Sequence, residues 1–327
     1  MLEFDLNEKS IIVFCPSFFG YDIDIKEALE KSGAKVSLFD ERVFKSVFGK
    51  ALIRFGFHWL IRFFVEKYYF SNLIVNVKEV DFLLLVNPET IPVKVLNEAK
   101  KLNPKMRIIT YMWDSFENKP QSKKYIEPSS SFFTFDYSDS EDYGIYFLPL
   151  FFVDDFNDLN TKLAKYDLSF IGTAHSQRYN TVLDIVKYAR SRFLFFYCPS
   201  VFVFLYKKLF KGELKGLKLN NVSFSSMHRF EIISLIEETN TIVDISHPCQ
   251  IGLTMRTIEM LGAGKKLITT NSQVLSYDFY HPDNILYYNG TLTLDVLNDF
   301  LKVPYRPVPN EIKYKYSIHS WVKRVFL

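Results

Sequence analysis

The sequence predicts an α/β protein of two successive doubly wound domains, and three observations lead to this expectation. Short apolar runs alternate with helical segments, as in a parallel sheet covered by helices. The run DFLLLVN at Asp81–Asn87 is apolar throughout, which is typical of a strand buried on both faces. The alternation restarts after the polar, acidic stretch 152–165. We therefore expect one domain over 1–155 and a second over 156–327.

The first domain is expected to hold six strands joined partly by helices. The strands are predicted at Ile11–Cys15, Lys35–Phe39, Asp81–Asn87, Met106–Trp113, Ser131–Phe135 and Tyr146–Leu150. Helices are predicted over Ile25–Ser32, which ends at Gly33, and over Val93–Leu102, which ends before Asn103-Pro104. This order is that of a Rossmann-like domain.

The second domain repeats the pattern. Strands are predicted at Asp167–Gly172, Phe193–Tyr197, Val222–Ser225, Thr241–Ile245 and Lys266–Thr270, and helices at Arg178–Arg190, Val201–Phe210, Phe230–Glu237 and Met255–Leu261. The stretch Glu311–Leu327 is expected to form one helix that packs back toward the first domain. Because ligands of open α/β sheets bind beyond the carboxyl ends of the strands, we expect the two domains to face each other across a cleft lined by such ends.

Composition narrows the class of protein. The net charge of +3 and 24% charged residues are too balanced for a nucleic-acid binder that relies on bulk charge. Three cysteines without a CxxC pair indicate neither a disulfide framework nor a zinc site. The polar start MLEFDLNEKS is unlike a signal peptide, and no apolar run is long enough to span a bilayer. These features predict a cytoplasmic protein, with peripheral contact to the inner face of the membrane as an addition argued below.

The stretch TIVDISHPCQIGLTMRTIEMLGAGKKLITTN, from Thr241 to Asn271, contains a strand, a loop, a helix and another strand. The amino end of such a helix attracts phosphate, and Arg256 in its first turn adds a planar, bidentate phosphate donor. Glu259 shares a helix face with Arg256, and a carboxylate can accept hydrogen bonds from both hydroxyls of a ribose. The alternative interpretation is a surface ion pair worth only ~0.3–0.5 kcal/mol.

The helix with its glutamate, the small-residue turn, Gly-Lys and the apolar strand ending in Thr-Asn together resemble the donor-binding signature of GT-B glycosyltransferases. The fuller stretch is similar to bacterial polysaccharide and lipopolysaccharide glycosyltransferases, including CgeB-like and group 1-like proteins. The resemblance implies a GT-B fold, a nucleoside diphosphate sugar as co-substrate, and Glu259 on the ribose. It also implies transfer to a glycan or lipid-linked glycan in surface polysaccharide synthesis. Ile251 stands where many retaining members carry a glutamate, with Gln250 beside it.

Further residues are expected on the donor side. Gly172, after the first strand of the second domain, permits close backbone approach, and Arg178 is expected in the same cleft as Arg256, although a solvated first-turn residue is the alternative. His175 and His247 lie on loops after strands, where each can bind a phosphate or sugar hydroxyl. The predicted donor-binding residues are Gly172, Arg178, His247, Gln250, Arg256, Glu259 and Lys265. No DxD-type pair follows a strand of this domain, so we expect a reaction without metal or other cofactor.

The acceptor side is expected in the first domain. Asp114 follows the strand Met106–Trp113 and is the candidate base for an inverting transfer, with a simple turn-capping role as the alternative. Gly20 allows a tight turn after the first strand, and Asp22 lies just beyond it. Asp22 and Asp136 are lesser candidates for the base.

The segment 44–70, called here the basic aromatic segment, has an unusual composition. Between Arg42 and Lys67 there are six basic residues and one acid, and Lys50, Arg54, His58 and Arg62 recur every four residues among aromatic and aliphatic side chains. This is the composition of a helix lying in a bilayer interface. We therefore predict that Lys50, Arg54 and Arg62 contact the membrane that presents a lipid-linked acceptor; the alternative is a core helix with a basic edge in solvent.

Two other functions remain open on the same fold. One is a nucleotide-sugar 2-epimerase, because a fold alone does not define an activity. The other is a non-catalytic subunit of a glycan-synthesis machinery with a vestigial donor site.

Overall fold

The computed structural model describes residues 5–43, 58–160, 162–247 and 251–327, and side chains from Phe63 onward in the helix that begins at His58. The described chain forms two compact units. The N-terminal unit comprises residues 1–149 together with Ile318–Leu327, and the C-terminal unit comprises Leu150–Ser317. The chain thus changes unit six residues before the boundary expected at 155, and its last ten residues rejoin the first unit.

The N-terminal unit is built on a six-stranded sheet in which all neighbouring strands are parallel. Its order is β2-β1-β3-β4-β5-β6, with strands β1 (Ser10–Cys15), β2 (Lys35–Asp40), β3 (Phe82–Val86), β4 (Arg107–Met112), β5 (Ser131–Thr134) and β6 (Tyr146–Phe147). The helices are α1 (Tyr21–Lys31), α3 (His58–Leu73), α4 (Val93–Leu102), α5 (Tyr137–Tyr143) and α12 (Ile318–Phe326). This is the doubly wound arrangement that the sequence predicts.

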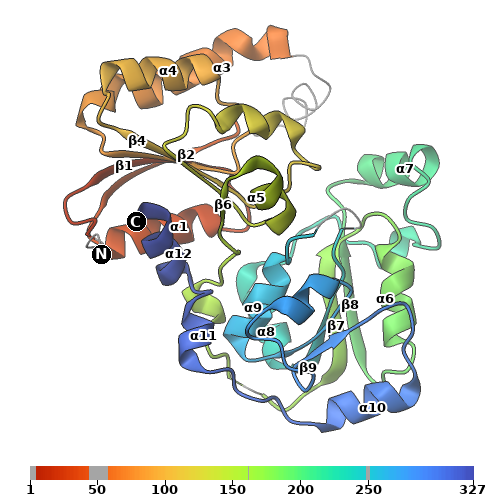
Figure 1. The fold of residues 1–327 in the computed structure, drawn as a ribbon. Helices are drawn as coiled ribbons and strands as arrows, with labels where there is room; N and C mark the ends of the chain where they lie inside the picture. Colours follow the sequence, from red (N-terminus) through yellow and green to blue (C-terminus); the bar gives the residue numbers. More distant parts are fainter. Residues whose placement is uncertain (1–4, 44–57, 161, 248–250) are drawn as a thin grey trace. The chain divides into compact units, whose positions relative to one another are not determined.

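Helices cover both faces of this sheet. On one face, α3 and α4 bury an apolar stripe that includes Tyr69 and Leu96, and α1 and α12 lie on the other (Figure 1). Trp321 of α12 packs edge-on against Tyr111 of β4 with ring centroids 5.0 Å apart. Phe326 does the same against Phe82 of β3 at 5.1 Å. The C-terminal helix therefore belongs to the core of the N-terminal unit, as expected.

The C-terminal unit has a five-stranded parallel sheet of order β11-β10-β9-β7-β8. Its strands are β7 (Tyr166–Thr173), β8 (Arg192–Tyr197), β9 (Thr239–Asp244), β10 (Lys266–Thr269) and β11 (Ile285–Tyr287). Its helices are α6 (Arg178–Val186), α7 (Val201–Phe210), α8 (Arg229–Glu237), α9 (Met255–Ala263), α10 (Leu294–Lys302) and α11 (Asn310–Tyr314). Short 3-10 turns occupy several loops of both units. The core is apolar around Phe170 and Ile268 on the central strands.

Two predicted elements differ. The single helix expected over Glu311–Leu327 is broken into α11 and α12, because the backbone at residues 316–317 pairs with Phe152 instead: the Phe152 N–H donates to the Tyr316 carbonyl at 2.8 Å. The strand expected at Val222–Ser225 is reduced to one isolated bridge between Ser223 and Tyr197 at the end of the edge strand β8.

Candidate functional site

Five polar residues lie in the segments that follow β7 and β9 and in the first half of α9. We call His175, Arg178, His247, Arg256 and Glu259 the strand-end site. His175 and Arg178 follow β7, His247 follows β9, and the other two lie in α9. Asp244, the last residue of β9, joins the two parts of the site through the contacts described next.

The amino end of α9 is fixed by Asp244. Thr254 is the N-cap, and its hydroxyl accepts the Thr257 N–H at 3.2 Å. The same hydroxyl and that of Thr257 donate to Asp244 Oδ2, at 2.5 and 3.0 Å. From the next strand, Asn271 donates to the carbonyls of Ile251 and Gly252, each at 3.1 Å. The loop into α9 is thus tied to β9 and to the end of β10, and the orientation of the helix end is set before any ligand binds.

Arg256 and Glu259 form an ion pair one helical turn apart, with 2.7 Å between Arg256 Nη1 and Glu259 Oε2. Their side chains are only 16% and 8% exposed. A solvated surface ion pair contributes little to stability. When two charges are shielded from water, removing one of them leaves the other unpaired and destabilises the fold. The surface-pair interpretation of this motif therefore does not describe the residues as they lie.

Arg178 connects the ends of β7 and β9. Its guanidinium donates to the Thr173 carbonyl at 3.0 Å and to the carbonyl of Ile245. Burial lowers its pKa to about 10, against the opposing effect of Asp244. Its Nε is out of contact with solvent and has no hydrogen-bond partner among the described residues. Arg178 is therefore an embedded cation with an unused donor, not a solvated first-turn residue.

Gly172 makes room for that arginine. A Cβ at this position would lie 2.6 Å from Phe170 Cζ and 3.2 Å from Arg178 Nη1. The side chains that come close to Gly172 belong to the same unit, and donor binding at this glycine stays a prediction.

Two histidine rings meet beside Arg178. The centroids of His175 and His247 are 5.1 Å apart, and Nδ1 of His247 is out of contact with solvent and has no partner within the described part of the chain. The pKa of His175 is lowered to about 3, first by burial and then by the electrostatic effect of Arg178, with smaller effects of His247 and Lys207. The ring is therefore neutral at pH 7, and its surroundings disfavour added positive charge. Such an environment favours an anion.

Lys265 does not lie with these residues. It precedes β10, so it stands at the amino edge of the sheet, where its ammonium donates to the carbonyls of Glu237 and Thr239 at 3.1 and 3.2 Å. Burial lowers its pKa. The expectation that Lys265 joins Arg256 is corrected by strand direction, because α9 runs back across the sheet before β10 starts.

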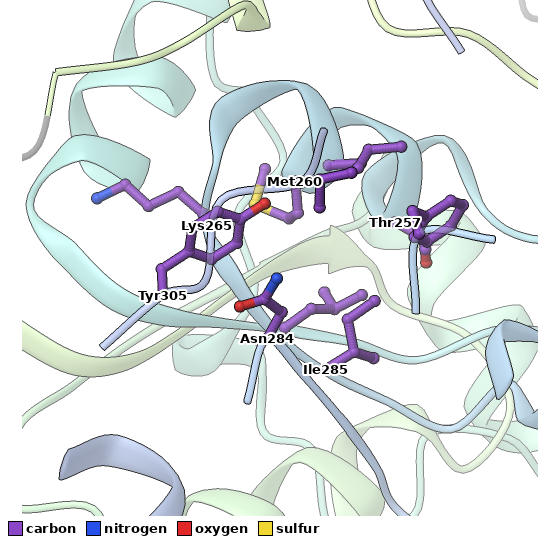
Figure 2. Close-up of a pocket in the computed structure, with 10 residues that line it drawn as sticks. Thr257, Met260, Lys265, Asn284, Ile285 and Tyr305 are labelled. Carbon is purple, nitrogen blue, oxygen red and sulfur yellow. The ribbon is translucent and has the colours of Figure 1, made fainter. Parts of the chain in front are cut away.

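A small cavity near Lys265 is lined by Met260, Asn284, Ile285 and Tyr305 (Figure 2). It offers about 10 Å³, room for one water at most, and the ammonium of Lys265 extends away from Asn284 and Ile285. This cavity is a packing gap behind α9 and not a ligand site.

In the N-terminal unit, Asp114 lies just past β4 with its side chain 42% exposed. The Asn87 amide donates to Asp114 Oδ2 at 3.0 Å, and Lys119 Nζ is 3.8 Å from the same oxygen.

The start of α1 holds the other two residues predicted for the acceptor side. Gly20 is the N-cap of α1 with φ 82°, a conformation that favours glycine. Asp22 is buried in the first turn, and its Oδ1 has no hydrogen-bond partner among the described residues. Asp136, the other lesser candidate, accepts the N–H groups of the first turn of α5 and so acts as a cap.

Sequence reasoning missed three polar residues that organise these edges. Asp244 is the last residue of β9, and Asn271 follows β10. Each comes directly after an apolar run, and this position at a strand end is the signal by which the sequence could have indicated them. Glu41 has no such signal: it is fully buried, accepts the backbone N–H groups of Glu89 and Thr90, and burial raises its pKa.

Some predicted residues fall outside what can be described. Gln250, Lys50 and Arg54 lie outside the described residues, and Arg62 is described only as part of the backbone of α3. Within the described ranges, no group of three or more His, Cys, Asp or Glu side chains is arranged to hold a metal ion. None of the described helices is long and apolar enough to cross a bilayer.

The two parallel sheets, their helices and the return of the last helix to the first unit define the GT-B fold. Two solved structures share it. The glycosyltransferase AviGT4, involved in avilamycin A biosynthesis, aligns with a TM-score of 0.56 and 10% sequence identity over 97% of this chain and 95% of its own. HepE of Anabaena, crystallised with UDP, aligns with a TM-score of 0.56 and 10% identity over 97% of this chain and 98% of its own. No family model and no curated protein sequence matches the chain.

Proposed function

We propose that this protein is a glycosyltransferase that moves a sugar from a nucleoside diphosphate donor to a glycan or lipid-linked glycan acceptor. The observation that carries the proposal is the strand-end site, which combines a helix amino end, two arginines and a histidine whose pKa is lowered to about 3. A shielded site at the carboxyl edge of a parallel sheet that offers two guanidinium groups and a helix amino end suits a diphosphate. The likeness of the fold to HepE, a structure in complex with UDP, supports the same class of donor.

In this proposal the residues of the strand-end site divide the work. The amino end of α9, Arg178 and Arg256 neutralise the leaving diphosphate, and Glu259 accepts hydrogen bonds from the ribose hydroxyls. His247 supplies a further hydrogen bond through a nitrogen that has no partner in the described protein. Fixed donors aimed at the charge that develops on the leaving group supply much of the rate, and this requires no metal ion.

The acceptor hydroxyl is deprotonated by Asp114 if the reaction inverts the anomeric configuration. The Asn87 amide, 3.0 Å from Asp114 Oδ2, orients that carboxylate. Gly20 and Asp22, at the start of α1, shape the same edge of the N-terminal sheet. The predicted membrane contact of the basic aromatic segment would bring a lipid-linked acceptor to this unit.

The proposal is tested first by binding. Nucleoside diphosphates and their sugars are screened by thermal shift, where a ligand at about 100 times its Kd adds ~2.7 kcal/mol, and the best is measured by calorimetry. We then follow transfer of labelled sugar to glycan acceptors. The Asp114→Asn variant should keep the wild-type donor affinity and lose turnover by at least about 100-fold.

Each other outcome has a defined meaning. Failure of every nucleoside diphosphate to bind contradicts the proposal. Binding with epimerised sugar in the absence of acceptor identifies the epimerase, and binding without turnover on any acceptor identifies the non-catalytic subunit.

A further inference from the structure

Helix α7 of the C-terminal unit presents its apolar side outward. Six of its ten residues are exposed and all six are apolar or aromatic: Val201 40%, Phe202 84%, Leu205 42%, Tyr206 48%, Leu209 71% and Phe210 78%. At 3.6 residues per turn they cover about half of the helix circumference. A helix of a globular domain normally turns that half toward the core, so α7 is inverted with respect to the usual pattern.

The lysines of α7 hold it in this orientation. Lys207 donates to the Ala174 carbonyl at 2.9 Å, and Lys208 donates to the Leu217 carbonyl at 2.6 Å. Phe204, on the same inner side, is 2% exposed and packs into the core of the unit. The helix is therefore anchored by two charged side chains and one aromatic ring, and its outward apolar face does not result from a loose attachment. Figure 1 shows α7 at the margin of its unit.

The surroundings of this face are positively charged. Residues 201–221 contain five lysines and a single acid, Glu213. Lys211, Lys215 and Lys218 are exposed. Glu213 is turned inward: its carboxylate accepts the Ser176 N–H at 3.1 Å and lies 3.9 Å from Lys207. The exposed part of this stretch therefore joins large apolar side chains to cationic ones.

We propose that α7 and the lysines that follow it form a docking surface for an anionic lipid bilayer, with Phe202, Leu209 and Phe210 entering the interface. Exposed aromatic and aliphatic side chains bordered by lysines are complementary to a membrane, whose surface is negative and whose interior is apolar. A second copy of this chain fits less well, because its matching face carries the same positive charge, whereas an anionic bilayer carries the opposite charge. This surface lies in the other unit from the basic aromatic segment, and it does not depend on the proposed sugar transfer.

Docking through α7 would act on the strand-end site. The Lys207 ammonium holds the carbonyl of Ala174, the residue before His175. The helix proposed to meet the bilayer is thus tied through Lys207 to the loop proposed to receive the donor. This places the transfer reaction at the membrane surface, where a lipid-linked acceptor resides.

The test uses the full chain and vesicles of phosphatidylcholine with or without phosphatidylglycerol. We expect wild-type protein to float with the anionic vesicles, and a triple variant Phe202→Ser, Leu209→Ser, Phe210→Ser to stay behind. A matched variant with Leu163→Ser, Leu294→Ser and Val296→Ser removes three exposed apolar side chains elsewhere in the same unit and should float like the wild type. A variant with Lys211→Gln, Lys215→Gln and Lys218→Gln should lose affinity for anionic vesicles by roughly tenfold or more.

Direct insertion is read from a Leu209→Trp reporter, whose fluorescence should be quenched by lipids brominated along the acyl chain, while a Leu294→Trp reporter in α10 should not be. All the substituted side chains are exposed, so thermal unfolding should be unchanged, and the lysine variant supplies the test should the serine variant unfold. Equal flotation of the α7 variant and the wild type overturns the proposal. The proposal is also overturned if the wild type does not bind vesicles and sediments as a dimer, while the α7 variant sediments as a monomer.

Discussion

Arg256 Nη1 lies 2.7 Å from Glu259 Oε2, and the two side chains keep only 16% and 8% of their surface in solvent. Removing one member of a shielded pair leaves the other charge unpaired, which costs about 3–5 kcal/mol when burial is complete. A substitution of Glu259 that tests ligand binding should therefore keep the size of the side chain and an oxygen that can accept a hydrogen bond from Arg256. This consideration shapes the first prediction.

Glu259→Gln keeps the volume of the side chain and removes its charge. We expect the Kd of the preferred nucleoside diphosphate to rise by about 10- to 100-fold, because hydrogen bonds to a charged acceptor contribute ~1.5–3 kcal/mol. The loss should be smaller for the matching 2′-deoxynucleotide, since that ligand already lacks one of the two hydroxyls assigned to Glu259. Calorimetry with both nucleotides measures this, with Asp295→Asn on the exposed start of α10 as the control. An unchanged Kd for both nucleotides would remove Glu259 from the site.

Gly172→Ala introduces a Cβ 2.6 Å from Phe170 Cζ and 3.2 Å from Arg178 Nη1. Phe170 cannot easily yield, because it is 2% exposed and packs on Phe196 with ring centroids 4.8 Å apart. We expect a loss of about 1–3 kcal/mol in the free energy of unfolding, measured by urea denaturation, and weaker nucleotide binding as Arg178 is displaced. Gly212→Asn is the control, since φ there is 64° and the space is open. Wild-type stability and affinity in Gly172→Ala would show that the site has more room than this geometry allows.

His175 predicts a pH dependence of stability. Its pKa falls from an ordinary value near 6.5 to about 3 in the folded protein, chiefly through burial. Between pH 3 and pH 6.5 this histidine is protonated in the unfolded chain and neutral in the folded protein. This group therefore stabilises the fold fully above pH ~6.5, and its contribution is lost as pH falls toward 3, with a slope of at most ~1.4 kcal/mol per pH unit. Urea denaturation of the wild type and His175→Gln at pH 7.5 and pH 4.5 should give a smaller loss in the variant, and parallel losses would contradict the prediction.

The sequence predicts the sheets well because parallel strands buried on both faces are continuous apolar runs, as in the Leu83–Val86 part of β3. Elements whose limits are set by residues far away in the sequence cannot be predicted from such local patterns. The break between α11 and α12 exists because Phe152 pairs with the backbone at Tyr316, more than 160 positions away. The three-residue strand β11 at Ile285–Tyr287 is too short to stand out from its surroundings.

The candidate site follows the same division. Arg256 and Glu259 could be placed together because they lie three positions apart on one helix, and the ion pair that joins them is local. The two carbonyls that Arg178 holds depend on the neighbouring order of β7 and β9, which the linear pattern does not contain. The outward apolar face of α7 does not follow from the sequence either, because the run VFVFLYKKLF predicts a helix but does not show that its two lysines bind carbonyls of the same unit.

A substitution of Lys265 should change the stability of the protein without changing its affinity for the nucleotide. The Lys265 ammonium donates to the carbonyls of Glu237 and Thr239 at the amino edge of the C-terminal sheet, whereas the strand-end site lies at the carboxyl edge. Lys265→Met should lower the free energy of unfolding by about 1–3 kcal/mol, because two buried carbonyls lose their donor. The Kd of the nucleoside diphosphate, measured by calorimetry on the folded variant, should not change. Arg256→Lys is the comparison, because it keeps the charge but loses the planar, bidentate donor and should weaken nucleotide binding. If Lys265→Met weakens the nucleotide as much as Arg256→Lys does, the phosphate contacts extend to the opposite edge of the sheet, and the site drawn around α9 is wrong.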